Sequence, residues 1–387
     1  MNPVARLSPA QRCYLDFIRF VAAFFVLFGH AAEYFLEGAR FNNGNIQAVG
    51  VLTFFLISGF LISTSAFQKS ADPKYTFRSF FIDRFARIYS CFLPALMFVV
   101  VIDMVMLNSP QYPWGATYNL RTWIGNLFML QDFPVFQALR RFGVDSTSFI
   151  SSFGSARQFW TISIEWWIYM VFGSVLFLVL RGSRPKWAVW GFVAFAAIEP
   201  FYYFVGGVNE CMSVLWVIGM GMSLFFLRLP RIMNSVPTMN AQHWSRGFLL
   251  LALFGMLCMA VRFVRITYVS ELQFGVFLAL ALFGLLFALA TAHVPAWFEK
   301  SIAWMANYSY SLYLTHLPIL TLFVFWFPER RWDPMLLVSA IVASNVFAIL
   351  FAYLFERHHR RLAKWLNGLG RRRPRVLEPI GKVSLPH

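Results

Sequence analysis

Ten apolar stretches, each about as long as a helix that crosses a lipid bilayer, run through the 387 residues of the chain. They cover roughly residues 14–37, 47–67, 86–107, 159–180, 187–205, 211–228, 247–265, 272–293, 302–327 and 334–355. The chain is 59% hydrophobic and 13% charged, whereas soluble domains are about 45–50% apolar and about 25% charged. These values exclude a disordered chain and an ordinary soluble enzyme. They predict an all-α, polytopic membrane bundle of about ten helices.

The positive charges predict how this bundle is oriented. With the N-terminus on the cytoplasmic side, 24 of the 33 Lys and Arg residues fall in cytoplasmic segments, as the positive-inside rule requires. We therefore expect both termini in the cytoplasm and the longest outer loop at 108–158. The first span is too long and too charged for a cleavable signal peptide, so we expect a retained helix. Residues 121–136 are short and half apolar, which favours an interfacial or re-entrant helix over an eleventh span.

The formal net charge of +16 has its origin in this topology. The basic residues lie in short loops between apolar stretches, so a nucleic-acid partner is not expected. The tail after residue 356 is a short amphipathic piece followed by four arginines, and we expect it to bind anionic lipid headgroups. The four cysteines are scattered without the spacing of a zinc site, and no metal is expected.

The first span carries polar side chains on one stripe. Arg19 and His30 are eleven residues apart, which returns to within about 20° of the same helix face after a rise of about 16 Å. Ionisable groups inside a membrane are costly and usually face a cavity or a partner. Arg19 is a candidate phosphate ligand, or a side chain that snorkels to the inner headgroups. His30 is a candidate catalytic base or a buried structural histidine, and Glu33, one turn beyond, is a candidate to orient it.

Two other spans complete the candidate site. Arg84 and Arg87 lie three residues apart at the cytoplasmic end of the third span. There, two guanidinium groups could bind phosphate oxygens or serve only as positive-inside anchors. Glu165 in the fourth span lies at about the depth of His30, so we expect a contact in which the carboxylate fixes the imidazole tautomer. The alternative for Glu165 is a structural pairing with an arginine.

Other polar residues of the spans are expected to be structural. His316 lies at mid-membrane in the ninth span with Tyr310 and Tyr313 nearby, and it favours a hydrogen bond within the bundle. Ser58 and Gly59 form a small-residue notch that predicts a close helix approach, and no nucleophile pattern surrounds the serine. Three ionisable residues near the outer ends of their spans are expected at the interface: Asp103, Glu199 and Arg262.

Five short patches follow one another along the chain in a characteristic order. They are Arg–ten residues–His (Arg19, His30); FFLISGFLI (54–62); Arg-x-x-Arg-Ile-Tyr (Arg84, Arg87, Ile88, Tyr89); Trp-Thr-Ile-x-x-Glu-x-x-x-Tyr (Trp160, Thr161, Ile162, Glu165, Tyr169); and SYSLYLTH (309–316). With these patches the chain resembles the membrane acyltransferase-3 family, polytopic O-acyltransferases that modify exported sugars. Ser90 stands where the family has a proline, and Ile168 where an aromatic residue is usual. No appended esterase-like domain is recognised, so we expect the membrane module alone.

The resemblance implies an acyl-CoA donor, most often acetyl-CoA, and a hydroxyl of a carbohydrate or lipid-linked glycan as the acceptor. The expected domains are a transmembrane acyltransferase-3 domain at 1–356 and a basic cytoplasmic tail at 357–387, in a bacterial cytoplasmic (inner) membrane. The expected site residues are His30 and Glu165 for catalysis, Arg19, Arg84 and Arg87 for the donor phosphates, and Tyr169, Tyr310, Tyr313 and His316 for substrate or structural support. His30 would act as a general base or form a transient acyl-histidine.

Two other classes of function remain open from the sequence. Ten spans with ionisable groups at mid-membrane are also typical of a transporter or flippase for glycans or small molecules. A non-catalytic membrane component of a polysaccharide assembly complex is the second alternative. The sequence also leaves open the identity of the acceptor, the length of the acyl chain and the oligomeric state.

Overall fold

The computed structural model describes residues 6–36, 45–109, 112–135, 150–182, 186–205, 211–236, 240–265, 272–329 and 333–369. Every regular element within these ranges is a helix. Ten helical segments of the described chain are long and apolar enough to cross a membrane. The predicted all-α fold with ten spans is therefore confirmed.

The long apolar segments are formed by α1 (Pro9–Phe35), α3 (Asn45–Lys69), α4 (Phe77–Met106), α7 (Trp160–Ser174) between η3 (Arg157–Phe159) and the π-helical η4 (Val175–Val179), α8 (Trp187–Val205), α9 (Met212–Ser235), α10 (Ala241–Arg265), α11 (Leu272–Ala288) with η5 (Leu289–Thr291), α13 (Ser309–Trp326) and α14 (Pro334–Leu354). The shorter elements are η1 (Gly115–Thr117), α5 (Leu120–Leu127), α12 (Ala296–Ala306), η6 (Glu356–His358) and α15 (His359–Leu369).

Local sequence signals explain where the helices depart from the predicted spans. The first helix starts earlier than predicted because Ser8 and Gln11 form a capping box around its first turn, with Pro9 at the first helical position. The predicted ninth span, 302–327, is broken at Asn307 into α12 and α13. The segment expected to be a short helix rather than a span contains α5, which has eight residues.

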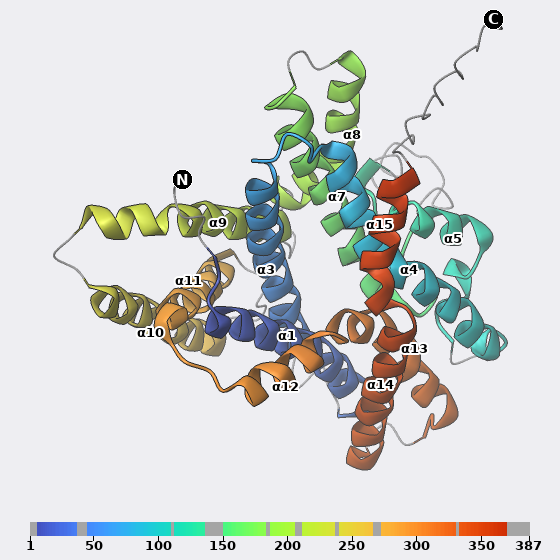
Figure 1. Cartoon of the computed structure of the whole chain (residues 1–387). Coiled ribbons are helices and arrows are strands. Elements are labelled where there is room, and N and C mark those ends of the chain that lie inside the picture. The colour runs from blue at the N-terminus through green and yellow to red at the C-terminus, as the bar shows by residue number, and fades with distance from the viewer. Residues whose placement is uncertain are drawn as a thin grey trace, which may run out of the picture.

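The helices surround a centre formed by α1 and α3 (Figure 1). α1 packs against α3, α12 and α13, while α3 packs along α9. α10 and α11 pair with each other at one side of the bundle, and α15 lies across α4. Large apolar side chains such as Val101 on α4 and Leu250 on α10 are exposed, as expected for helices that face lipid.

A small-residue notch lets α3 and α9 approach closely. A Cβ atom added at Gly59 would overlap the backbone carbonyl oxygen of Trp216, and one added at Gly219 would overlap that of Leu56. The predicted close approach at the Ser58–Gly59 notch is therefore confirmed, with α9 as the partner. This crossing fixes the position of Ser58, which lies beside the cavity described below.

Two acidic residues that were expected at the interface are instead fully buried. Asp103 accepts hydrogen bonds from Ser155 N at 2.7 Å, Ser155 Oγ at 2.6 Å and the Tyr112 hydroxyl at 2.7 Å. Glu199 accepts one from Ser163 Oγ at 2.6 Å. The expectation used only their position near the helix ends and did not include the hydroxyl and amide donors of Tyr112, Ser155 and Ser163 that enclose these carboxylates.

The α3–α9 crossing generates a stability prediction. Gly59→Ala should destabilise the protein by about 1–3 kcal/mol, because the new methyl group must push two backbones apart. The matched control is Gly221→Ala on α9, where an added Cβ meets nothing within 4 Å and helix propensity favours alanine. Thermal unfolding of both variants in the same detergent measures the difference. Equal midpoints for the two variants would contradict the close crossing.

Candidate active site

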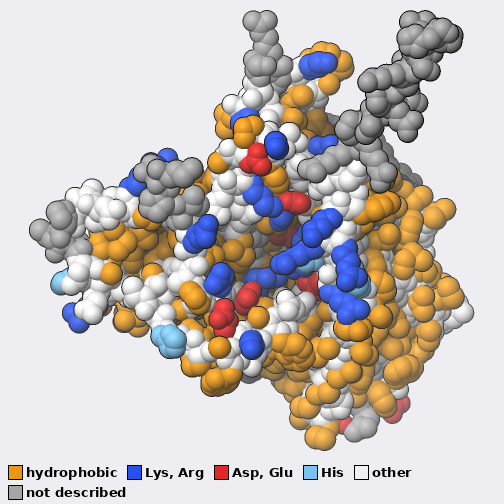
Figure 2. Space-filling view, in the orientation of Figure 1, with side chains coloured by type: hydrophobic (Ala, Val, Ile, Leu, Met, Phe, Trp, Pro, Cys, Tyr) orange, Lys and Arg blue, Asp and Glu red, His pale blue; other side chains and the backbone are white. Residues whose placement is uncertain are grey.

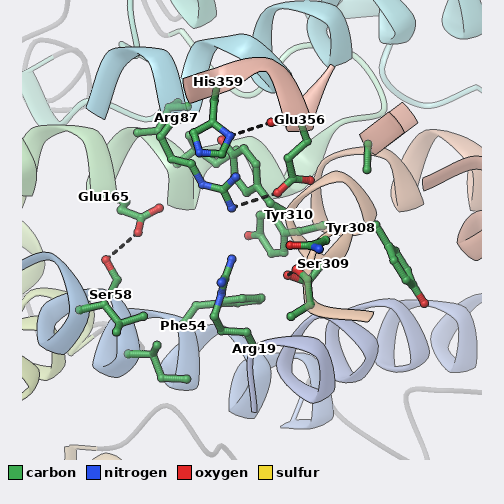
Figure 3. A pocket seen from close by; sticks show the side chains of 18 of the residues that line it. Arg19, Phe54, Ser58, Arg87, Glu165, Tyr308, Ser309, Tyr310, Glu356 and His359 are labelled. Atoms are coloured by element: carbon green, nitrogen blue, oxygen red, sulfur yellow. Dashed lines mark hydrogen bonds and ion pairs between the residues drawn. The ribbon is translucent and has the colours of Figure 1, made fainter. Parts of the chain in front are cut away.

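A cavity of about 850 Å³ opens between α1, α3, α4, α7, α13, α14 and the segment that follows α14. The three arginines that the sequence singled out, Arg19, Arg84 and Arg87, all line it. Figure 3 shows Arg19 on α1 and Arg87 on α4 pointing toward one another from opposite walls. Side chains from two separate spans, α1 and α4, therefore converge on one space.

Each of these arginines is held differently. Arg19 pairs with Asp16, one turn earlier on α1, at 3.5 Å. The Arg87 guanidinium pairs with Glu356 at 2.9 Å and lies over the Tyr310 ring, 5.5 Å from its centroid. Arg84 has no acidic partner among the described residues, and its buried Nε atom has no hydrogen-bond partner there. Arg84 is thus the arginine with the most free hydrogen-bonding capacity.

Glu356 is a site residue that the sequence analysis missed. It directly follows the last apolar span, and its side chain is buried. Besides Arg87, it accepts hydrogen bonds from the Ser311 backbone N at 3.1 Å and from Ser311 Oγ at 2.7 Å. An acidic residue immediately after an apolar run was the available signal, because a carboxylate at that point must find cationic or polar partners.

Glu165 lines the same cavity and is held by two hydroxyl groups. Ser58 Oγ donates to its Oε1 at 2.7 Å, and the Tyr169 hydroxyl donates to the same oxygen. Trp216 Nε1 in turn donates to Ser58 Oγ at 3.3 Å. The residues of the Trp-Thr-Ile-x-x-Glu-x-x-x-Tyr patch therefore act together with the serine of the small-residue notch.

His30 does not contact Glu165, contrary to the expectation from their matching depth. Its Nδ1 lies 3.3 Å from the Glu33 carboxylate, which also accepts a hydrogen bond from Gln47 Nε2. The reason is that depth says nothing about rotation: Glu33 is one turn along on the same helix face, whereas Glu165 is turned toward Ser58. The candidate that could orient His30 is thus Glu33.

The His30 ring stacks on that of His316, with centroids 5.5 Å apart and planes 22° apart. His316 is fully buried, and its Nδ1 lies 2.8 Å and 3.1 Å from the carbonyl oxygens of Tyr313 and Leu312. Carbonyls accept only, so Nδ1 carries the proton. The bundle contact expected for His316 is thus a bond to its own helix, and its Nε2 is a buried acceptor without a partner among the described residues.

Two aromatic rings form a wall of the cavity, and one of them also lies beside the histidine pair. Phe54 and Tyr313 line the cavity and pack edge to face at 5.6 Å, and the Tyr313 ring lies 6.0 Å from His316. The two histidines are absent from the described lining of the cavity. The described cavity, which includes the arginines, therefore does not extend to His30.

The rim of the cavity carries further polar groups. Tyr308 lines it, and burial raises the pKa of its hydroxyl, which remains a donor toward Asn345 at 3.4 Å. Arg357, His359 and Arg360 line the end formed by η6 and α15. Within the described residues, His, Cys, Asp and Glu side chains nowhere gather in threes as a metal site would require.

Comparisons with known proteins show the family to which the chain belongs. The model of the acyltransferase domain that defines the acyltransferase-3 family matches residues 13–357. Similar curated proteins include the O-acetyl transferase of Shigella phage Sf6, 25% identical over 56% of this chain and 61% of that protein. Others are nodulation protein 10 of Rhizobium leguminosarum bv. viciae (26%; 60% and 65%) and the peptidoglycan O-acetyltransferase OatA of Listeria monocytogenes (24%; 71% and 45%).

The chain thus spans less than two thirds of the length of each of these relatives. No solved structure matches the chain at the same level of significance. The family match, however, extends over nearly the whole chain and includes every residue of the cavity up to Arg357. With its ten apolar spans, the chain is an integral membrane protein that belongs to the acyltransferase-3 family.

Proposed function

We propose that the protein transfers an acyl group, in the first instance acetyl, from acyl-CoA to a hydroxyl of a carbohydrate or lipid-linked glycan. The observation that carries the proposal is the convergence of Arg19, Arg84 and Arg87 on one large cavity inside an apolar bundle. Three guanidinium groups in such a place are costly unless they meet anions. Two relatives, an O-acetyl transferase and a peptidoglycan O-acetyltransferase, support both the acetyl group and the glycan.

The donor's diphosphate would lie between the facing guanidinium groups of Arg19 and Arg87, with Arg84 beside it. Arginine forms bidentate, charge-assisted hydrogen bonds to phosphate oxygens, and the free donors of Arg84 suit this role. The pantetheine arm would then extend along the apolar lining toward Phe54 and Tyr313. Glu165, fixed by Ser58, would accept hydrogen bonds from amide N–H groups of that arm.

For the chemical step, His30 would take the proton of the acceptor hydroxyl through Nε2, because Nδ1 faces the Glu33 carboxylate. The oxygen would attack the thioester carbonyl, the new C–O bond would form, and the C–S bond would break. The CoA thiolate would leave with the proton from the imidazolium, which Glu33 stabilises meanwhile. In the variant mechanism, His30 is itself acylated before the acceptor arrives.

The wall formed by Phe54 and Tyr313 adds a requirement to this mechanism, because the cavity does not extend to His30. The thioester can reach His30 only if the rings of Phe54 and Tyr313 separate, so donor binding must include their rearrangement. Such a step keeps water from the thioester until the arm is in place. The same scheme has the arginine end of the cavity facing the cytoplasm of a bacterial inner membrane, with both chain termini on that side, in agreement with the excess of Lys and Arg there.

His30→Ala should lower acetyl transfer from labelled acetyl-CoA at least about 100-fold, because a positioned general base contributes about 10²–10⁴-fold. The protein is purified in lipid nanodiscs and supplied with membrane glycans from its host. His243→Ala is the matched control, since His243 is exposed near the start of α10. A His30→Ala protein that inserts normally and retains turnover would exclude the proposed base. A wild-type protein without any turnover of acetyl-CoA would overturn the function itself.

Two carboxylate variants separate the possible partners of His30. Glu33→Gln should lower kcat about fivefold with little change in KM, because a partly exposed ion pair contributes up to about 1 kcal/mol. Glu165→Gln, a change of the same kind, should act mainly on the KM for acetyl-CoA. Steady-state kinetics on both variants measure the split. The reverse pattern would restore Glu165 as the partner of His30 in the reacting complex.

Arg84→Gln should weaken acetyl-CoA binding about tenfold or more, because a hydrogen bond to a charged group contributes about 1.5–3 kcal/mol. Arg87 is a poorer target, since its removal would leave Glu356 buried without its cation. Arg246→Gln, at an exposed position on α10, is the control. Isothermal titration at two salt concentrations measures both. An affinity equal to wild type at low salt would exclude Arg84 from the donor site.

A further inference from the structure

We infer that Arg357 and Arg360, at the rim of the cavity, bind the phosphate monoester on the ribose of the donor and thereby select acyl-CoA over acyl donors that lack this phosphate. The inference rests on the proposed function, because it takes acyl-CoA to be the occupant of the cavity. It assigns a role to the first residues of the basic tail, which the sequence analysis had interpreted only as a lipid contact.

The rim is built from η6 and the first turn of α15. Arg357 and Arg360 both line the cavity there, together with His359. The Arg357 guanidinium lies over the ring of Tyr353, 3.5 Å from its centroid, which fixes its direction. α15 itself is held across α4, where Arg78 Nη2 donates to the carbonyl oxygen of Leu366 at 3.0 Å. Arg357 therefore has a defined direction beside the opening, and the helix that carries Arg360 is held in place.

The charges deeper in the cavity nearly cancel one another. Arg19 pairs with Asp16 and Arg87 with Glu356. The third arginine shares the cavity with Glu165. Three cations are thus offset by three carboxylates, so the deep part of the cavity has little net charge and would bind the donor's diphosphate by hydrogen bonds.

Acyl-CoA carries about two negative charges on its diphosphate and about 1.5 to 2 on its phosphate monoester at neutral pH. The balanced deep cavity leaves much of this charge unmatched. Arg357 and Arg360 form no ion pair with an acidic residue of the described chain. Figure 2 shows Lys and Arg side chains gathered around the central hollow on this face, with the few acidic groups among them. The uncompensated positive charge therefore lies at the rim.

The order of groups along the donor fits this distribution. With the thioester end at the Phe54–Tyr313 wall and the diphosphate between the deep arginines, the adenosine lies outermost. Its phosphate monoester then comes to the rim, where two guanidinium groups can bind a dianion by paired hydrogen bonds. A phosphate monoester and a lipid phosphate share this chemistry, so the test must separate the two sources.

The test compares acetyl-CoA with 3′-dephospho-acetyl-CoA as donors. The wild-type protein should prefer acetyl-CoA about tenfold or more in kcat/KM, as expected for charge-assisted hydrogen bonds to one phosphate. Arg357→Gln/Arg360→Gln should lose most of this preference, and Arg357→Lys/Arg360→Lys should keep part of it. The control is Arg361→Gln/Lys364→Gln, which changes the same number of charges on exposed positions of α15 that do not line the cavity. All measurements are made in phosphatidylcholine nanodiscs and repeated with phosphatidylglycerol.

Each outcome has a distinct meaning. If the wild-type protein turns over both donors equally well, or if the Gln double variant keeps the wild-type preference, the rim assignment is wrong while the proposed function stands. If the double variant differs from wild type only in phosphatidylglycerol, the rim binds lipid headgroups and the assignment is again overturned. If neither donor is turned over by the wild-type protein, the proposed function and the rim site both fail. Turnover of the dephospho donor by the variant shows that it is folded.

Discussion

The ion pair between Arg87 and Glu356 joins the beginning of α4 to the end of α14. Both groups are enclosed by an apolar bundle, where neither charge could remain alone without a cost of several kcal/mol. Glu356 also accepts two hydrogen bonds from Ser311 on α13. A single carboxylate thus ties three helices together, and it holds the start of η6 and α15 at the opening. The cavity, its deep arginines and its rim all depend on this contact.

Two other acidic residues of the bundle, Glu33 and Glu165, are satisfied by different partners. Glu33 lies on the stripe of α1 that carries His30, and it pairs with the imidazole Nδ1. Glu165 lies on the cavity side of α7 and is satisfied by hydroxyl groups. The bundle therefore places His30 with its own carboxylate outside the arginine-lined cavity, whereas Glu165 lines that cavity. In the proposed mechanism, these two compartments must communicate during acyl transfer.

Much of the fold followed from the sequence, because the cost of burying polar groups in lipid determines where the spans lie. The ten helices and the convergence of three arginines from two separate spans were predictable on that basis. The break at Asn307 was not, since an apolar stretch continues across it. The choice between Glu33 and Glu165 as the partner of His30 was not determined either, because depth along two helices leaves their rotation undetermined. Glu356 was overlooked because it was treated as the boundary between a span and a tail, although its charge demanded a partner.

The cavity is lined by α1 at one end of the sequence and by η6 and α15 at the other. During synthesis, the first helix enters the membrane long before the last one emerges from the ribosome. The pocket around the arginines is therefore complete only after α14 has been inserted and α15 has packed on α4. A wrongly inserted copy would therefore lack the complete pocket that the proposed donor requires.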